Sequence, residues 1–343
     1  MENIVRLHRR IAPELMAVVE ERYHILRQIL YSQPVGRRAL AASLAVGERI
    51  VRAQVDFLKS AGLVDFSPLG MTITQDGKAI LVELAGYIRL LHGLTSLEAE
   101  LAAKLGMELV IIPGNSDIDG AVRKDLGRSA AAVLARWLGE PVTVAVSGGS
   151  TTARMAQAFA DSFPRTLVVP ARGALGEEVE YQANTVAAVL AGKLGGRYRL
   201  LHMPDAVSDQ ALAALLDSDA NIRDMAAIVG RADIVVYGVG QAERMAVRRR
   251  LSPALIGELL RRGAVGESLG DYCTLDGEIV YATAGIGLRL KDLSLISRKM
   301  MIAGGAKKAA AIVAVANAGG GGMLVTDEAA ARAIQAIVNN PNK

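Results

Sequence analysis

The first part of the chain carries apolar residues at the three- and four-residue spacing of amphipathic helices. This spacing holds from about Arg10 to Tyr31, and Pro34 ends it. Two shorter segments with the same pattern follow, Arg37–Leu44 and Glu48–Ser60, separated only by Ala45-Val46-Gly47. A tight turn between two such helices predicts a helix-turn-helix.

Two short β-prone runs come next, Val64–Phe66 and Met71–Thr74, around the turn sequence Ser67-Pro68-Leu69-Gly70. They predict a β-hairpin. Because a helix-turn-helix followed by a hairpin is a winged helix, we expect residues 1–75 to form such a domain. Residues 76–106 predict one or two linking helices, which could pair with their copy in another subunit through an apolar face of Ile80, Leu84, Tyr87, Ile88 and Leu91.

From Met107 onward, short apolar runs alternate with helical stretches. The candidate strands are Glu108–Ile112, Val142–Val146, Thr166–Val169, Arg199–His202, Ile234–Tyr237, Ile279–Thr283, Met300–Ala303 and Met323–Thr326. The helical stretches between them include Gly120–Leu138, Thr151–Ser162 and Glu178–Leu194. Apolar strands joined by crossover helices predict an α/β domain over residues 107–343, with a mostly parallel, Rossmann-like sheet covered on both faces. Ligands bind such sheets at the carboxyl ends of the strands.

Composition and charge indicate a globular protein with a basic N-terminal part. Hydrophobic residues make up 51% of the chain and charged residues 22%, which gives no sign of disorder. The net charge of +4 permits a polyanionic partner without requiring one. Residues 1–75 hold nine Arg and one Lys against five Glu and two Asp, so +3 of the excess lies there. This asymmetry favours a basic module in the predicted winged helix.

Cysteine usage and hydropathy indicate the cellular setting. The only cysteine, Cys273, excludes an intramolecular disulfide and a cysteine-based metal site, and it fits the reducing cytoplasm. Since no apolar stretch follows the charged segment Met1 to Arg10, we expect no secretory signal. The apolar run Ala309–Val325 is split by Gly319–Gly322 into a short helix and a short strand, so we expect no membrane span.

The helix predicted at Glu48–Ser60 has features of a DNA-reading helix. The apolar pattern places inward Leu40, Leu44, Val46, Ile50, Val51, Val55 and Leu58. The residues that then project outward near the start of this helix are Arg49, Arg52 and Ala53. At such positions an Arg can bond bidentately to guanine in the major groove.

Arg37 and Arg38 open the preceding helix and suit contacts to DNA phosphates. Solvation of an amphipathic helix would explain the same arginines, and Glu48 and Asp56 on the second helix count against DNA. The hairpin, the turn spacing and the local charge together favour DNA.

A glycine turn follows the predicted strand Val142–Val146. In Ser147-Gly148-Gly149-Ser150-Thr151, the glycines let backbone N–H groups approach an anion. Ser150 and Thr151 add hydroxyl donors at the positive end of a helix. We therefore predict a phosphate site here, with the alternative that Ser150 or Thr151 serves only as a helix N-cap.

Other predicted strands end in similar loops. Gly304-Gly305-Ala306-Lys307-Lys308 follows Met300–Ala303, and a lysine in the first turn of a helix favours a bound anion because it opposes the helix dipole. Lys308 is the stronger candidate, and solvent exposure of both lysines is the alternative. Arg172 and the run Arg248–Arg250 could serve a second phosphate, although a solvated face explains such a run more often.

Cofactors and metals are not indicated. Gly238-x-Gly240 lacks the third glycine of a dinucleotide fingerprint, since Glu243 stands at that position, and this disfavours a nicotinamide cofactor. No His, Cys and carboxylate residues lie at metal-ligand spacing. We therefore predict neither cofactor nor metal.

Six separated motifs together resemble the SorC/DeoR-type family of bacterial sugar-responsive transcription regulators. They are Ser147-Gly148-Gly149-Ser150-Thr151, Pro170-Ala171-Arg172-Gly173, Gln182-Ala183-Asn184-Thr185, the stretch from Asp233 to Gly240, Gly266-Glu267-Ser268, and Gly304-Gly305-Ala306-Lys307-Lys308. The resemblance covers nearly the whole chain. It implies a homo-oligomeric repressor, dimer or tetramer, that binds double-stranded operator DNA. It also implies a phosphorylated sugar as effector, which in the branch of the family that this chain resembles is fructose 1,6-bisphosphate and weakens operator binding.

Carried over position by position, the resemblance also implies an effector site. One phosphate would lie against Gly149, Ser150, Thr151 and Lys308, the other against Arg172 and Arg248, and sugar hydroxyls against Glu267 and Gln182. Ser150 stands where a threonine is usual, which keeps a hydroxyl. Gly47 stands where the recognition helix usually begins with Ser or Thr, which weakens a cap.

The α/β domain is also similar to the sugar-phosphate isomerase and deaminase superfamily. In those enzymes the loop after the glycine strand carries an Asp-Gly-His catalytic element, whereas here Gln241-Ala242-Glu243-Arg244 follows Gly240. Because proton transfer needs positioned acid and base groups, we predict a binding site without catalysis. An isomerase or deaminase with an appended helix-turn-helix is the alternative, and a head that binds protein is a third.

Overall fold

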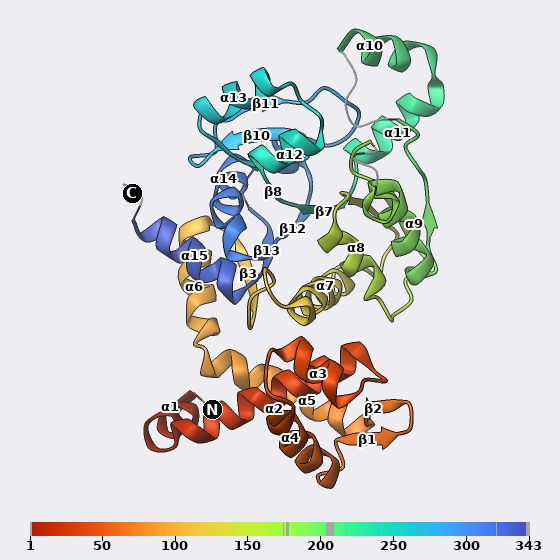
Figure 1. The fold of residues 1–343 in the computed structure, drawn as a ribbon. Coiled ribbons are helices and arrows are strands. Elements are labelled where there is room, and N and C mark those ends of the chain that lie inside the picture. Colours follow the sequence, from red (N-terminus) through yellow and green to blue (C-terminus); the bar gives the residue numbers. More distant parts are fainter. Residues whose placement is uncertain (1, 174, 176–177, 204–208, 320, 341–343) are drawn as a thin grey trace. The chain divides into compact units, whose positions relative to one another are not determined.

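The computed structural model describes residues 2–173, 175, 178–203, 209–319 and 321–340. Its contacts divide the chain into two compact units, Met1–Ser96 and Leu97–Lys343. In Figure 1 the first unit runs from red to orange, and the second runs on to blue. The division falls inside the linking segment expected at 76–106.

The first unit is a winged helix with additional helices. Its elements are α1 (Glu2–Ile11), α2 (Pro13–Ser32), α3 (Arg37–Leu44), α4 (Glu48–Ser60), β1 (Val64–Ser67), β2 (Gly70–Ile73) and α5 (Gln75–Leu91). Helices α3 and α4 have the predicted bounds, and Ala45 between them takes a left-handed conformation with φ 54°. The hairpin β1–β2 is antiparallel, with Val64 opposite Ile73.

The buried face of α4 consists of Val51, Val55 and Leu58, which join α2, α3 and the hairpin in one hydrophobic core. The prediction that Val46 and Ile50 also point inward is wrong, because they are 36% and 49% exposed. Successive residues of an α-helix are rotated by about 100°, and here the core covers the side of Val51 and leaves that of Ile50 exposed.

The single helix predicted from about Arg10 to Tyr31 is broken after Ile11. Pro13 begins α2, and Ala12 before it has φ −142° and ψ 64°. Proline lacks an N–H and disfavours helical geometry in the preceding residue, so the periodicity continues across a break in the helix.

The linking segment forms two helices, α5 and α6 (Leu94–Leu105), with Thr74 Oγ1 accepting a hydrogen bond from the N–H of Gly77 at the start of α5. Ile88 and Leu91 pack into the core of the first unit, whereas Ile80 is exposed. Among the described residues no single helix has the length and apolar composition to cross a membrane; only α5 and α6 together, bent by 64°, have both.

The second unit contains a parallel sheet of seven described strands in the order β3-β13-β12-β7-β4-β5-β6. These strands are β3 (Glu108–Ile112), β4 (Val142–Val146), β5 (Thr166–Pro170), β6 (Arg197–Tyr198), β7 (Ile234–Gly238), β12 (Arg298–Ile302) and β13 (Met323–Asp327). After β4 the chain adds β5 and β6 on one side of β4, and it then returns to add β7, β12 and β13 on the other side. Adjacent β4 and β7 thus form the switch point, where the loops at the carboxyl ends diverge and ligands bind.

The second unit also contains helices. They are α7 (Gly120–Ala135), α8 (Ser150–Gln157), α9 (Ala183–Leu194), α10 (Asp209–Ser218), α11 (Ala220–Gly230), α12 (Ala242–Arg248), α13 (Pro253–Arg261), α14 (Ala309–Gly319) and α15 (Glu328–Asn339), with short 3-10 helices η1 (Val179–Tyr181), η2 (Leu290–Leu295) and η3 (Ala306–Lys308). α7, α8 and α9 share a hydrophobic core with the central strands. The apolar run Ala309–Val325 was expected to divide into a helix and a strand, and α14 and β13 confirm this. Gly320 between them lies outside the described residues.

A second, antiparallel sheet of four strands was not predicted. Its order is β11-β10-β9-β8, with β8 (Gly240–Gln241), β9 (Ala264–Ser268), β10 (Asp271–Thr274) and β11 (Ile279–Ala282). The segment expected as parallel strand Ile279–Thr283 is β11 of this sheet. Leu269 and Gly270, with φ 50° and 81°, make the two-residue turn between β9 and β10.

Four other expected elements differ in extent. Arg199–His202 follows the strand instead of forming it, because the side chain of Asn184 donates to the carbonyl of Leu201 and accepts from its N–H. The helices expected to reach Leu138 and Ser162 end at Ala135 and Gln157. The stretch expected as one helix from Glu178 divides at Gln182, whose φ and ψ of −70° and 144° are extended.

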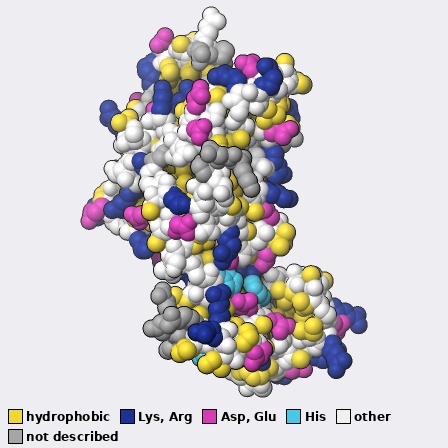
Figure 2. Space-filling view, turned by 90° about the vertical axis from the view of Figure 1, so that its left-hand side faces the viewer, with side chains coloured by type: hydrophobic (Ala, Val, Ile, Leu, Met, Phe, Trp, Pro, Cys, Tyr) yellow, Lys and Arg dark blue, Asp and Glu magenta, His cyan; other side chains and the backbone are white. Residues whose placement is uncertain are grey.

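The surface of the second unit is mixed in charge. On the face that Figure 2 shows, basic and acidic side chains are interspersed over this unit. Such interspersion is typical of a solvated surface. The basic groups that matter for the site are instead gathered in a cavity.

Candidate functional site

A cavity of about 760 Å³ opens in the second unit, where the loops that follow β4, β5, β7 and β12 meet. It is lined by all eight residues predicted for the effector, which are Gly149, Ser150, Thr151, Arg172, Gln182, Arg248, Glu267 and Lys308. The structure therefore brings together residues that the sequence separates by up to 159 positions.

The glycine turn after β4 shapes one wall. Gly149 has φ 128° and is the N-cap residue of α8, so the alternative that Ser150 or Thr151 is the N-cap is wrong. Its N–H donates to the carbonyl of Tyr181 at 2.8 Å, and a Cβ on Gly148 would lie 2.6 Å from that same oxygen. The glycines thus let the turn pack closely against η1, while Ser150 and Thr151 occupy the positive end of α8 at the cavity.

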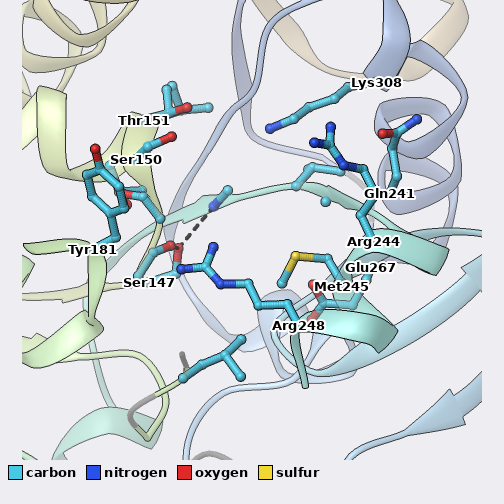
Figure 3. Close-up of a pocket in the computed structure, with 18 of the residues that line it drawn as sticks. Ser147, Ser150, Thr151, Tyr181, Gln241, Arg244, Met245, Arg248, Glu267 and Lys308 are labelled. Atoms are coloured by element: carbon cyan, nitrogen blue, oxygen red, sulfur yellow. Dashed lines mark hydrogen bonds between the residues drawn. The ribbon is translucent and has the colours of Figure 1, made fainter. Parts of the chain in front are cut away.

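Ser147 joins the two central loops. Its hydroxyl accepts a hydrogen bond from the N–H of Gly238 at 3.0 Å, the dashed line in Figure 3. Its own N–H donates to the carbonyl of Val236 at 2.9 Å. The turn after β4 and the end of β7 are therefore fixed relative to each other at the switch point.

Basic side chains form the opposite wall. In Figure 3, Arg244, Arg248 and Lys308 extend toward the side of the cavity that carries Ser150 and Thr151. Burial, and secondarily the Arg244 guanidinium, lower the pKa of Lys308. A bound anion would relieve both effects, because it replaces lost water and offsets the repulsion.

The loop that carries Lys308 is held by carboxylates. Asp327, at the end of β13, is fully buried and accepts hydrogen bonds from the N–H groups of Ser116, Gly305 and Ala330 at 2.7–3.1 Å. Asp117 accepts from the N–H of Lys307 at 3.3 Å. These bonds tie the loops after β3 and β12 together at the edge of the cavity.

A cluster of buried charges lies behind the cavity. Glu267 on β9 pairs with Arg249 at 2.8 Å, and both side chains are only 4% exposed. Asp271 on β10 pairs with Arg289 at 3.1 Å, and burial raises the pKa of Asp271. With Arg172 the cluster has three cations and two carboxylates, so it favours an anion in the cavity.

Arg172 is fixed in the cavity wall. It is 5% exposed, and its guanidinium donates to the carbonyls of Thr283 at 3.2 Å and Leu288 at 3.4 Å. Burial, followed by repulsion from Arg249, lowers the pKa of Arg172 to about 10. Its position is set before any ligand arrives, which reduces the ordering cost of binding.

Several lining residues were not predicted from the sequence. They are Asp117, Arg123, Arg154, Tyr181, Gln241 and Arg244. Arg244 and Arg248 are one helical turn apart on α12, a spacing that the sequence contains and that places both on one face. Arg249 lies directly after α12 and its partner Glu267 lies on β9, so no local spacing in the sequence indicates that the two pair.

The cavity lining contains few acidic residues. Within the described part of the chain it contains no histidine or cysteine, and its carboxylates are Asp117 and Glu267. Glu267 accepts from Arg249 and from the N–H of Gly270 at 2.8 Å. Glu243 is exposed on α12 outside the lining. No group of three or more His, Cys, Asp or Glu that could hold a metal is found in the described residues.

The first unit presents the residues predicted to contact DNA. Arg49, Arg52 and Ala53 are exposed on the first turns of α4. Arg38 and Arg52 each lie within 3.6 Å of Glu48, and Arg37 pairs with Asp56 at 2.8 Å. Glu48 and Asp56 therefore pair with three of the four arginines predicted to contact DNA.

Comparisons with known proteins agree with both units. Residues 90–336 match the family described as "Putative sugar-binding domain", and residues 18–88 match the "CggR N-terminal DNA binding domain". A crystal structure from Enterococcus faecalis, described as a SorC family transcriptional regulator, has a TM-score of 0.65 at 36% identity, covering 70% of this chain and 99% of that one. The chain belongs to the SorC family of sugar-binding transcription regulators.

Two relatives that match most of the chain share one description. The central glycolytic genes regulator of Priestia megaterium is 40% identical over 85% of this chain and 86% of its own length. The regulator of the same name from Bacillus subtilis is 36% identical over 86% and 88%. The full-length sorbitol operon regulator SorC from Klebsiella pneumoniae, at 17% identity, shares the fold over 94% of this chain and 98% of its own, with a TM-score of 0.64.

Proposed function

We propose that the chain is a cytoplasmic, homo-oligomeric repressor of glycolytic genes whose binding to operator DNA is weakened by fructose 1,6-bisphosphate. The observation that carries the proposal is the cavity, where a helix N-terminus with Ser150 and Thr151 faces Lys308, Arg244 and Arg248. Phosphates favour such groups. The names of the relatives support the target genes.

The site binds its ligand without transforming it. Glu267 is engaged by Arg249, so it is poorly placed to move a proton in a sugar substrate. The role left to the Glu267 carboxylate is to accept hydrogen bonds from sugar hydroxyls. Gln182, also in the cavity lining, would share this role. Incubation with hexose phosphates that produced an isomerised or deaminated product would favour the enzyme instead.

The effector acts by population shift. A bisphosphate that bridges several loops favours the arrangement of subunits in which those loops lie at the right separation, and this changes the spacing of the DNA-binding heads. Linkage is reciprocal, so operator DNA should weaken fructose 1,6-bisphosphate binding by the same factor. Calorimetric titration with and without an operator duplex tests this. If the affinity for fructose 1,6-bisphosphate is the same with and without the operator duplex, the two sites are not coupled and this mechanism is wrong.

Lys308→Met is expected to weaken fructose 1,6-bisphosphate binding about 10- to 100-fold, because one charge-assisted hydrogen bond contributes about 1.5–3 kcal/mol. Titration calorimetry with this ligand measures the loss. Binding of operator DNA in the absence of ligand should stay unchanged.

The matched control is Lys193→Met, which removes an exposed lysine of α9 outside the cavity lining. It should bind fructose 1,6-bisphosphate like the unmodified protein. If both variants bind equally well, Lys308 does not contact the ligand and the proposed site is wrong.

A further inference from the structure

The DNA-facing helix carries a large aliphatic side chain that the first unit does not bury. Ile50 is 49% exposed, directly before the fully buried Val51 on α4. Single exposed apolar residues are common on protein surfaces and need no explanation by themselves. Here the position matters, because it lies in the first turn of the second helix of a helix-turn-helix.

The surroundings of Ile50 favour DNA over an apolar protein partner. Arg49 beside it is exposed, and the structure records no ion pair for Arg49 within the described residues. Arg52 and Ala53 follow at two and three positions, and both are exposed. Val46 and Phe57 are exposed as well, at 36% and 46%, but Arg22 stacks on the ring of Phe57. An apolar side chain beside the cation of Arg49 is complementary to the edge of a base pair flanked by phosphates.

Helix geometry places Ile50 and Ala53 on adjoining parts of one surface, since residues three apart are neighbours. The major groove offers one apolar feature to such a surface, the C5-methyl group of thymine. Arg49 can bond to guanine in the same groove.

We propose that Ile50, with Ala53 beside it, contacts the C5-methyl group of a thymine in each operator half-site, next to the base pair contacted by Arg49. This inference rests on the proposed DNA-binding function and deepens it. It assigns specificity to a side chain without hydrogen-bonding groups, so the base preference would depend on one methyl group.

Uracil substitution in the DNA tests the assignment, because it removes only the methyl group. A duplex is first selected from a randomised pool with the full-length protein. Each thymine is then replaced singly by uracil. We expect about fourfold weaker binding at one thymine per half-site, the factor that corresponds to burying one methyl group.

The same duplexes are then tested with a protein variant that lacks most of the Ile50 side chain. Ile50→Ala should bind the thymine and uracil duplexes with equal affinity at that position, while circular dichroism shows an unchanged fold. Val82→Ala, which shortens a side chain 73% exposed on α5, is the matched control and should keep the fourfold difference.

Different failures have different meanings. If the unmodified protein binds every uracil duplex as tightly as the parent duplex, the thymine contact is wrong and DNA binding itself stands. If Ile50→Ala keeps the uracil sensitivity and instead changes the oligomeric state in size-exclusion chromatography, Ile50 contacts a second copy of the chain. If no duplex is retained even at low salt, the proposed function fails along with the contact.

Discussion

Replacing Glu267 by Gln is expected to lower the free energy of unfolding by about 3–5 kcal/mol, the usual cost of removing one partner from a buried ion pair. The side chains of Glu267 and Arg249 are each 4% exposed, and 2.8 Å separates the Glu267 Oε1 and Arg249 Nη2 atoms. Arg172 is buried in the same cluster. In the variant, Asp271 is the one remaining carboxylate of the cluster, against the three cations Arg172, Arg249 and Arg289. Urea unfolding of the full chain, followed by circular dichroism, measures the change.

The matched control is Glu258→Gln, which removes one partner of an exposed pair with Arg262 at 4.0 Å on α13. Such pairs contribute at most about 1 kcal/mol. Replacing Glu267 and Arg249 together by apolar residues should recover part of the lost stability, because Arg249 is then no longer a buried charge without its partner. Equal losses for Glu267→Gln and Glu258→Gln would contradict this account of the cluster.

Asp327→Ala is expected to lower the free energy of unfolding by about 3 kcal/mol or more. Its carboxylate accepts from three amides, those of Ser116, Gly305 and Ala330, and a buried amide without a partner costs about 1–3 kcal/mol. The variant should also weaken ligand binding, because the loop of Lys308 loses its attachment to β13. The shift of the thermal unfolding temperature and a calorimetric titration measure the two effects.

Asp219→Ala supplies the comparison for this variant. Asp219 caps α11 by accepting from the amides of Asn221 and Ile222, and its loss should cost about 1 kcal/mol. Asp327 caps α15 in the same way and holds two further loops. If Asp327→Ala costs no more than Asp219→Ala, the bonds to Ser116 and Gly305 contribute nothing measurable.

Much of the candidate site was predictable because its residues follow strands. Ser150 and Lys308 come directly after apolar runs that end in glycines, and parallel strands bring such loops to one edge of a sheet. The bounds of α3 and α4 were predictable for a similar reason, since a short apolar repeat is interrupted there by Ala45-Val46-Gly47.

The buried charges were not predictable in the same way. Arg172 is held by carbonyls of Thr283 and Leu288, more than 100 positions further along the chain. Glu267 meets Arg249 because β8 pairs with β9, in a sheet whose turn has Leu269 where Asn, Asp or Gly is usual before Gly270. Ile50 shows a different limit, because a local pattern cannot tell which flank of a short helix the core leaves uncovered.

The cavity lining is drawn from segments between Ser116 and Lys308, so one small ligand would hold together loops from more than half of the chain. A ligand at a hundred times its dissociation constant adds about 2.7 kcal/mol to the stability of the folded state. Proteases in the cell cut chains that open, so empty copies would be degraded faster than occupied ones. If a sugar phosphate weakens operator binding as proposed, the abundance of the regulator would then rise with the concentration of that ligand, while the fraction bound to DNA would fall.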